Sequence, residues 1–306
     1  MGVYQIGEVI KRTRESLGIT QEELYDGICS AETLSRIENG KRPPSNANFR
    51  ALMGRLGKDD EKYRMFVHSG DMETIMEAMN IDILISHDEN EKAEKVFEHF
   101  KQMVDLEDNA NRQYVIKTQA LIDHRLGRIS VQTKRERLVE AFLCTIPNYK
   151  KGILPQRVYS RHEIFIYCNI AITYFQEGDL ETAISMLRQA EAYFERTAIS
   201  TEERAVSEVL MLSNLGQCLG VKGDTKEAIE VEERGVRKCL DNGNGSLLEH
   251  LLYNVAFEKE ILQEDEKACK ELLLQAYFVA ESNNNVYMMN HIKEHMKRMY
   301  GEIVNV

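Results

Sequence analysis

Residues 20–45 read TQEELYDGICSAETLSRIENGKRPPS, and this stretch decides the fold of the N-terminal part of the chain. The Thr20 hydroxyl can accept a hydrogen bond from the Glu23 amide while the Glu23 carboxylate bonds back to Thr20, which is the capping box that starts a helix. Residues 31–40 predict a second short helix, closed by Asn39 and Gly40 as a C-terminal stop. Two short helices separated by a tight turn predict a helix-turn-helix.

Two further helices are predicted on either side of this motif, over residues 6–17 and 46–56. Apolar residues recur in both segments at the spacing of one helical face. The sequence therefore predicts an N-terminal domain over residues 1–65 and a second domain over residues 66–306. A length of 306 residues suits one small and one large domain, at roughly 100–200 residues for each domain.

The scarcity of proline favours an all-α fold. The chain has four prolines, at Pro43-Pro44, Pro147 and Pro155, so long stretches lack the residue that most disrupts a helix interior. A composition of 43% hydrophobic and 29% charged residues indicates a protein with real cores rather than a disordered chain.

The net charge of −11 is unevenly distributed along the chain. Residues 1–66 hold 11 Lys and Arg against 10 Asp and Glu, whereas the remainder holds 28 against 40. A mildly basic N-terminal domain can bind nucleic acid if its cations lie on one face, and an acidic remainder limits indiscriminate binding to DNA.

Several classes of protein are disfavoured by what the sequence lacks. Its six cysteines form no CxxC pair, its first residues lack the apolar core of a signal peptide, and no run approaches the roughly 18 apolar residues of a membrane span. We therefore expect a cytoplasmic protein without membrane segments. No phosphate-cradling GxxxxGK, GxSxG or paired-carboxylate site stands out, so we expect no enzyme activity and no cofactor.

The TQEEL and SRIENGKRPPS segments resemble the helix-turn-helix of the phage-repressor-like (XRE) regulators over about 60 residues. The segment between Leu24 and Ile37 is one residue shorter than in the usual member. Its turn at Ile28-Cys29-Ser30 resembles the variant found in the RRNPP (PlcR-like) group of peptide-pheromone receptors. The resemblance implies a transcription regulator that binds a double-stranded DNA operator.

In that architecture the second helix of the motif enters the major groove. The resemblance implies base contacts from Ser30, Glu32, Thr33 and Arg36, and phosphate contacts from Gln21, Lys41 and Arg42. Arg36 can pair with guanine O6 and N7, and Glu32 can accept from cytosine N4. The alternative is that Glu32 and Arg36, four residues apart, form only a surface ion pair.

The second domain contains internal repeats that become visible when three segments, beginning at Tyr167, Leu212 and Leu252, are aligned. One column holds asparagine, the column ten residues further on holds an acid, and the column fourteen residues further on holds alanine. These columns are Asn169, Asn214 and Asn254; Asp179, Asp224 and Glu264; and Ala183, Ala228 and Ala268. Gly178 and Gly223 mark the turns.

This pattern resembles the degenerate tetratricopeptide repeat, in which paired helices stack into a right-handed superhelical array. Weaker pairs are expected over residues 72–107, with Ala93 in the alanine column, and over 111–147, with Gly127 at the turn. A last helix over residues 286–300 would cap the array. The second domain is thus expected to hold about five helix pairs and a capping helix.

The asparagine column is the most informative feature of this domain because a primary amide can both donate to and accept from a peptide backbone. The resemblance to peptide-binding tetratricopeptide proteins implies that Asn169, Asn214 and Asn254 clamp a short extended peptide. Gln217, Tyr253 and Phe257 would help to line the groove. The alternative is that each asparagine only bonds to a neighbouring helix.

Two minor features have competing interpretations. His291 and His295 lie four residues apart on a predicted helix, which could grip a metal, but no third ligand is visible and a solvated face is favoured. Methionines such as Met288, Met296 and Met299 are expected in the core, although a methionine stripe on the capping helix could serve a homodimer that binds two half-sites.

The sequence therefore predicts a quorum-sensing regulator whose array binds a short signalling peptide and thereby controls DNA binding allosterically. Two alternatives stay open. The array could bind a protein partner in place of a peptide, or the protein could modulate an enzyme in the manner of the phosphatase members of the same group.

Overall fold

The computed structural model describes residues 6–42, 44–57, 69–150, 152–196, 202–243, 245 and 247–301. Within these ranges every regular element is a helix, apart from one isolated bridge between Lys150 and Ile153. The all-α prediction is therefore confirmed for the described part of the chain. No helix in these ranges is long and apolar enough to span a membrane.

The four predicted N-terminal helices are present within two residues of their expected ends, except that α2 is only five residues long. They are α1 (Ile6–Ser16), α2 (Gln21–Tyr25), α3 (Ala31–Glu38) and α4 (Asn46–Arg55). Their common core holds the apolar residues that the helical spacing places inward, among them Ile10, Leu24, Leu34 and Leu52, each with no exposed surface. α1 and α2 both pack against α3.

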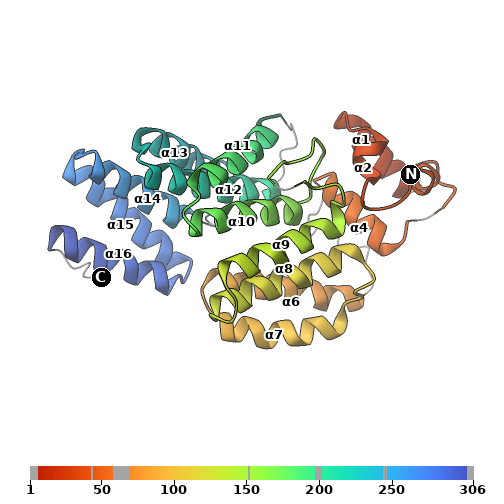
Figure 1. The fold of residues 1–306 in the computed structure, drawn as a ribbon, viewed down its shortest axis with the longest axis horizontal. Coiled ribbons are helices and arrows are strands. Elements are labelled where there is room, and N and C mark those ends of the chain that lie inside the picture. Colours follow the sequence, from red (N-terminus) through yellow and green to blue (C-terminus); the bar gives the residue numbers. More distant parts are fainter. Residues whose placement is uncertain are drawn as a thin grey trace. The chain divides into compact units, whose positions relative to one another are not determined.

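After α4, the described residues form five successive helix pairs and a final helix in chain order (Figure 1). The pairs are α6 (Ser69–Ser86) and α7 (Asn90–Met103), α8 (Asn109–Arg125) and α9 (Val131–Thr145), α10 (Arg161–Gln176) and α11 (Leu180–Arg196), α12 (Glu202–Lys222) and α13 (Thr225–Asp241), and α14 (Leu248–Ile261) and α15 (Glu266–Ser282). The capping helix is α16 (Val286–Tyr300). Its bounds match the prediction.

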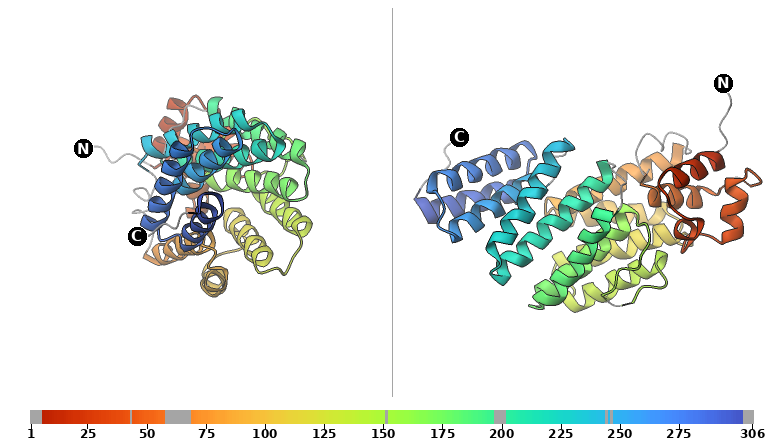
Figure 2. Two further views of the ribbon diagram at one scale, coloured as in Figure 1. Left: turned by 90° about the vertical axis from the view of Figure 1, so that its left-hand side faces the viewer. Right: turned by 90° about the horizontal axis from the view of Figure 1, so that it is seen from above.

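The chain divides into two compact units. The first comprises residues 1–173 and 193–204, and the second comprises 174–192 and 205–306. In the first unit α6 packs on α7, α7 on α8 and α8 on α9; in the second, α13 packs on α14, α14 on α15 and α15 on α16 (Figure 2). The expected domain boundary near residue 65 falls outside the described residues and stays a prediction.

The turns inside the repeats show why their register was only partly predictable. Gly178 and Gly223 adopt positive φ values of 85° and 96°, as glycine does readily. In the last pair Gln263 takes the same position with a φ of 56°, and one extra residue follows before the helix begins.

The prediction that Ala268 is the third member of the alanine column is therefore wrong. Ala183 and Ala228 are fully buried, but Ala268 is exposed, and Cys269 takes the buried position with 1% of its surface exposed. The residue before the helix is correspondingly Asp265, whose carboxylate accepts a hydrogen bond from the Ala268 amide at 3.1 Å, and not Glu264. A one-residue insertion at the turn explains both shifts.

Candidate functional site

The two helices of the predicted helix-turn-helix begin at side-chain caps. The Thr20 hydroxyl accepts from the Glu23 amide at 3.2 Å while Glu23 Oε2 accepts from the Thr20 amide at 2.7 Å, which confirms the capping box. At the start of α3 the Ser30 hydroxyl accepts from the Thr33 amide at 3.2 Å. Each cap satisfies backbone donors that the first turn of a helix leaves unpaired. The Thr20 cap thus fixes where α2 begins, and the Ser30 cap fixes where α3 begins.

The outer face of α3 and the residues after it form one polar, mostly exposed surface. Glu32, Ser35, Arg36, Asn39, Lys41 and Arg42 line a hollow of about 590 Å³ on it. Of the residues predicted to contact bases or phosphates, Ser30, Glu32, Arg36, Lys41 and Arg42 are exposed, and Thr33 is half-buried. The surface carries three cations against one carboxylate, so it can attract a polyanion.

Glu32 and Arg36 form an ion pair on this surface. Arg36 Nη2 lies 2.8 Å from Glu32 Oε1, and the two side chains are 57% and 73% exposed. An exposed pair of this kind stabilises a helix by only about 0.3–0.5 kcal/mol. The pair can therefore open at little cost when a stronger partner, such as the edge of a base pair, approaches Arg36.

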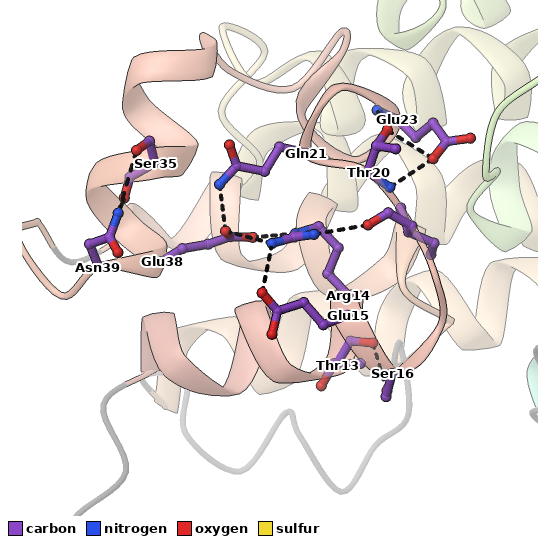
Figure 3. Close-up of polar contacts among 11 residues, drawn as sticks. Thr13, Arg14, Glu15, Ser16, Thr20, Gln21, Glu23, Ser35, Glu38 and Asn39 are labelled. Atoms are coloured by element: carbon purple, nitrogen blue, oxygen red, sulfur yellow. Dashed lines mark hydrogen bonds and ion pairs between the residues drawn. The ribbon is translucent and has the colours of Figure 1, made fainter.

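Gln21, a predicted phosphate contact, is held by a buried ion pair that the sequence did not reveal (Figure 3). Arg14 Nε and Nη2 donate to the Glu38 carboxylate at 2.6 and 3.0 Å, and Gln21 Nε2 donates to the same carboxylate at 2.6 Å. Only 1% of the Glu38 side chain is exposed. The two hydrogen bonds of this bidentate pair join α1 to α3. The hydrogen bond to Glu38 also raises the pKa of Arg14.

The helix-turn-helix is attached to later parts of the same compact unit by a second buried ion pair. Arg55 Nη2 of α4 donates to Glu163 Oε1 of α10 at 3.0 Å, with 1% and 4% of the two side chains exposed. Arg55 Nη1 donates to the backbone oxygens of Leu24 and Asp26. Arg157 Nη2 donates to the backbone oxygen and to Oδ2 of Asp26, both at 2.7 Å.

Two further contacts belong to this attachment. A Cβ atom placed on Gly27 would lie 2.0 Å from the Thr145 carbonyl oxygen, so only glycine lets the turn after α2 approach the end of α9 this closely. Val158, 7% exposed, packs into the core shared by α1 to α4. We call the contacts of Asp26, Gly27, Arg55, Arg157 and Glu163 the attachment site.

The three asparagines of the predicted clamp are all half-buried on the first helices of their pairs. Asn169, in the first unit, donates from Nδ2 to the Phe165 carbonyl at 3.0 Å within α10. Asn214 and Asn254 lie in the second unit on α12 and α14. Gln217, one turn beyond Asn214, is exposed.

Tyr253 and Phe257 form an aromatic stack on α14 next to Asn254. Their ring centroids lie 6.4 Å apart with an interplanar angle of 16°, and Phe257 is 39% exposed. The Tyr253 hydroxyl lies 3.0 Å from His291 Nε2 and 3.1 Å from His295 Nδ1 of α16. The structure thus brings the predicted Tyr253 and Phe257 into contact, while Asn254 lies beside Tyr253 in the same helix.

The expectation of a solvated face for both histidines is wrong for His295. Its side chain is 1% exposed, and Nε2 lies 2.9 Å from Glu260 Oε2. His291 is exposed and its pKa is lowered, first by partial burial and then by His295. Among the described residues no group of three His, Cys, Asp or Glu side chains could hold a metal ion.

A buried lysine is a polar feature of the first unit that no motif indicated. Lys117 of α8, 2% exposed, lies 3.2 Å from Asp82 Oδ1 of α6, and its Nζ sits 4.1 Å from the centre of the Tyr114 ring. Burial lowers the pKa of Lys117, while Asp82 opposes that shift. The cluster is a charged residue held in an aromatic environment, an arrangement that cation–π attraction stabilises.

Two protein-family descriptions match separate parts of the chain. The description "Helix-turn-helix" matches residues 10–62, and "RNPP family C-terminal domain" matches residues 78–300. No curated protein matches the sequence.

Solved structures of low sequence identity share the fold. PlcR of Bacillus thuringiensis in complex with the peptide PapR7 and DNA has a TM-score of 0.64 at 17% identity, covering 95% of this chain and 99% of that one. The apo form of the same protein has a TM-score of 0.59 at 15% identity, with 97% and 100% covered. Apo ComR from S. thermophilus has a TM-score of 0.50 at 14% identity, with 96% and 98% covered.

Proposed function

This chain belongs to the RNPP family, and from that premise we propose that it is a sequence-specific transcription regulator whose repeat domain binds a short signalling peptide. The observation that carries the proposal is the combination of two parts in one chain. An RNPP C-terminal domain over residues 78–300 follows a helix-turn-helix whose second helix presents an exposed, mainly basic face.

The chemistry of that face supports sequence-specific binding to DNA. Arg36 can form a bidentate pair with guanine, Glu32 can accept from cytosine, and Ser30 and Thr33 can contact either base edge. Lys41 and Arg42 follow α3 and would neutralise phosphates. Gln21, at the start of α2, donates to Glu38 at 2.6 Å, and a side chain held in this way suits a phosphate contact that sets the register of the protein on the duplex.

The chemistry of the repeat domain supports peptide binding. Asn169, Asn214 and Asn254 each offer a primary amide at equivalent positions of three repeats, and a half-buried amide can hold peptide backbone without reading its sequence. Beside Asn254, the stack of Tyr253 and Phe257 offers partly exposed aromatic surface for an apolar side chain of the peptide. Gln217 adds a polar group one turn from Asn214.

The attachment site supplies a physical connection between the two activities. Because Arg55 and Glu163 are buried and Gly27 touches the end of α9, a change in the arrangement of α9 and α10 changes the position of the helix-turn-helix. In a homodimer that binds two half-sites, a change in the position of each helix-turn-helix would change the distance between the two motifs, and DNA binding would respond to that distance. The proposed mechanism requires that the peptide binds two conformations with different affinity. We place the protein in the cytoplasm.

Affinity selection tests the peptide-binding part of the proposal. The full-length protein is incubated with a synthetic library of random heptapeptides, and the retained peptides are identified by mass spectrometry. A Gln217→Ala, Asn169→Ala, Asn214→Ala, Asn254→Ala variant with an unchanged circular dichroism spectrum is the matched control. Retention that the variant loses supports the clamp. Retention of no peptide, together with specific capture of one host protein, would favour a protein partner.

Selection from randomised duplex DNA tests the DNA-binding part. The wild type should enrich one site with two related halves, and Arg36→Ala should enrich a site that is degenerate at one position in each half. Enrichment of the same site by both proteins would remove Arg36 from the set of base contacts.

A further inference from the structure

The eighth residue of each second helix is buried in all five repeats, and in one repeat it is an acid. These residues are Phe97, Leu138, Leu187, Glu232 and Leu273, each with at most 1% of its surface exposed. Four of them contribute to apolar cores in the ordinary way. Glu232 of α13 places a carboxylate at the equivalent position, where an unpaired charge is costly.

A second glutamate, in α14, is also buried at a position where other repeats bury a residue of another type. Glu258 lies four residues after Asn254, and the equivalent positions of the two preceding repeats hold Thr173 and Cys218, both fully buried. Glu258 itself is 6% exposed. The boundary between α13 and α14 thus buries two carboxylates where the other repeats bury small or apolar side chains.

Two glycines of α12 make room for these carboxylates. A Cβ atom on Gly216 would lie 2.3 Å from Cγ and 2.6 Å from Oε1 of Glu232, and a Cβ atom on Gly220 would lie 2.0 Å from Oε1 of Glu258. Both glutamates therefore press directly against the backbone of α12.

The part of the chain that the structure describes supplies no cation that compensates these two carboxylates. Among the ion pairs of the described residues none includes Glu232 or Glu258, and both oxygens of Glu232 and Oε2 of Glu258 lack a well-aligned hydrogen bond. The helix α12 presents the two glycines, α13 presents Thr225 near Glu258, and α14 presents Asn254 near Glu232. Burial, and then the charge of Glu258, raise the pKa of Glu232 to about 8, and burial also raises the pKa of Glu258.

We propose that Glu232 and Glu258 form a proton-binding pair and that Glu232 is a positioning residue, which orients the side-chain amide of Asn254 according to whether Glu232 carries a proton. This inference rests on the proposed function, because Asn254 is one of the residues proposed to hold the peptide. It adds a regulatory input, the proton, to that site.

The coupling follows from the hydrogen-bonding capacity of the two groups. A charged carboxylate can only accept, so it attracts the NH2 group of Asn254 and withdraws this donor from the peptide. A protonated carboxyl can donate to the Asn254 oxygen, which leaves the NH2 group free to bind a peptide carbonyl. Peptide affinity should therefore fall as pH rises above 8, by about fivefold for the loss of one ordinary hydrogen bond.

Nuclear magnetic resonance on the full-length protein tests the orientation step without any peptide. Asparagine is labelled with ¹³C at Cγ, and the Asn254 signal is assigned by its absence in Asn254→Ala. The wild-type signal should shift with a midpoint near pH 8, and the Glu232→Gln variant should show no such shift. The Asn214 signal is the internal control, and Glu232→Leu tests whether the fold needs an acid at this position.

An Asn254 signal that does not titrate, or that titrates equally in Glu232→Gln, would overturn the inference. Retention of the heptapeptide library at pH 7 and pH 9 tests the second step. Retention that falls in the wild type but not in Glu232→Gln supports it, whereas equal pH dependence in both proteins overturns it. A titrating Asn254 in a protein that retains no peptide at any pH supports the proton-binding pair and contradicts the proposed peptide-binding function.

Discussion

Arg55 and Glu163 are separated by 108 residues in the chain, yet Arg55 Nη2 donates to Glu163 Oε1 at 3.0 Å in a nearly water-free environment. The carboxylate also accepts from the Ser160 amide through Oε2 at 2.7 Å, so it caps α10 and holds α4 at the same time. One side chain thus links the start of α10 to α4, the helix that follows the helix-turn-helix.

Replacing Glu163 by glutamine should destabilise the protein strongly. The variant leaves the Arg55 guanidinium buried without a counter-ion, and breaking a buried pair in this way costs about 3–5 kcal/mol. The free energy of unfolding from urea denaturation at pH 7 measures the effect. Glu8→Gln is the control, because Glu8 pairs with Arg12 on the exposed surface of α1 and should contribute less than about 1 kcal/mol. Equal losses in both variants would mean that the buried pair of Arg55 and Glu163 contributes no more stability than an exposed pair.

Arg36→Ala and Lys41→Ala should weaken DNA binding in different ways. Loss of the Arg36 guanidinium should reduce discrimination at one base pair by about 1–3 kcal/mol. Loss of Lys41 should weaken binding to all sequences alike and reduce the slope of log affinity against log salt by about 0.9. Fluorescence anisotropy on the selected site and on a one-base variant, at several salt concentrations, separates the two effects. If Arg36→Ala changes only the slope of log affinity against log salt and leaves base discrimination unchanged, Arg36 contacts a phosphate and not a base.

The helices of the protein could be predicted from the sequence because their signals are local. The capping box of Thr20 and Glu23, the stop at Gly40 and the turn glycines Gly178 and Gly223 each act within a few residues, and each is present in the structure. The register of the last pair could not be predicted, because an extra residue after Gln263 shifts the helix without changing its composition.

The interactions between distant segments left no signal in the sequence. Glu38 lies next to the predicted base-contacting residues, but nothing in SRIENG indicates that its partners are Arg14 and Gln21. The burial of Glu232 could not be predicted for another reason, which is that an acidic side chain on a helix is usually solvated. Its own burial, together with that of its equivalents Leu187 and Leu273, shows that this position faces inward. The roles of Asn169, Asn214 and Asn254 in peptide binding stay predictions.

Glu232 should make the stability of the protein fall as pH rises. Its pKa is raised from 4.5 to about 8 in the folded protein, so the folded state binds more protons than the unfolded state between these values. The contribution of Glu232 to the free energy of unfolding is fully present below pH 4.5 and is lost as the pH rises to 8. It amounts to roughly 1.4 kcal/mol for each unit by which the pKa differs between the folded and unfolded states.

The comparison of wild type with Glu232→Leu isolates this contribution. The variant introduces the residue that three other repeats bury at the same position, and it removes a poorly partnered carboxyl. Its free energy of unfolding should exceed that of the wild type by an amount that grows between pH 5 and pH 8. The difference should stay constant with pH if Glu232 is ionised normally in the folded protein.

Tyr253→Phe should separate the structural role of the Tyr253 hydroxyl from the proposed role of its ring. The hydroxyl lies between two histidines of α16, and its removal leaves Nδ1 of the buried His295 without this partner. Loss of such a partner costs about 1–3 kcal/mol, which urea denaturation can measure. The stack on Phe257 is preserved in this variant, so peptide retention should remain, whereas Tyr253→Ala should lose both stability and retention. Suppose that Tyr253→Phe is as stable as the wild type but retains no peptide. The Tyr253 hydroxyl would then bind the peptide directly, and its contacts with the two histidines would contribute nothing to stability.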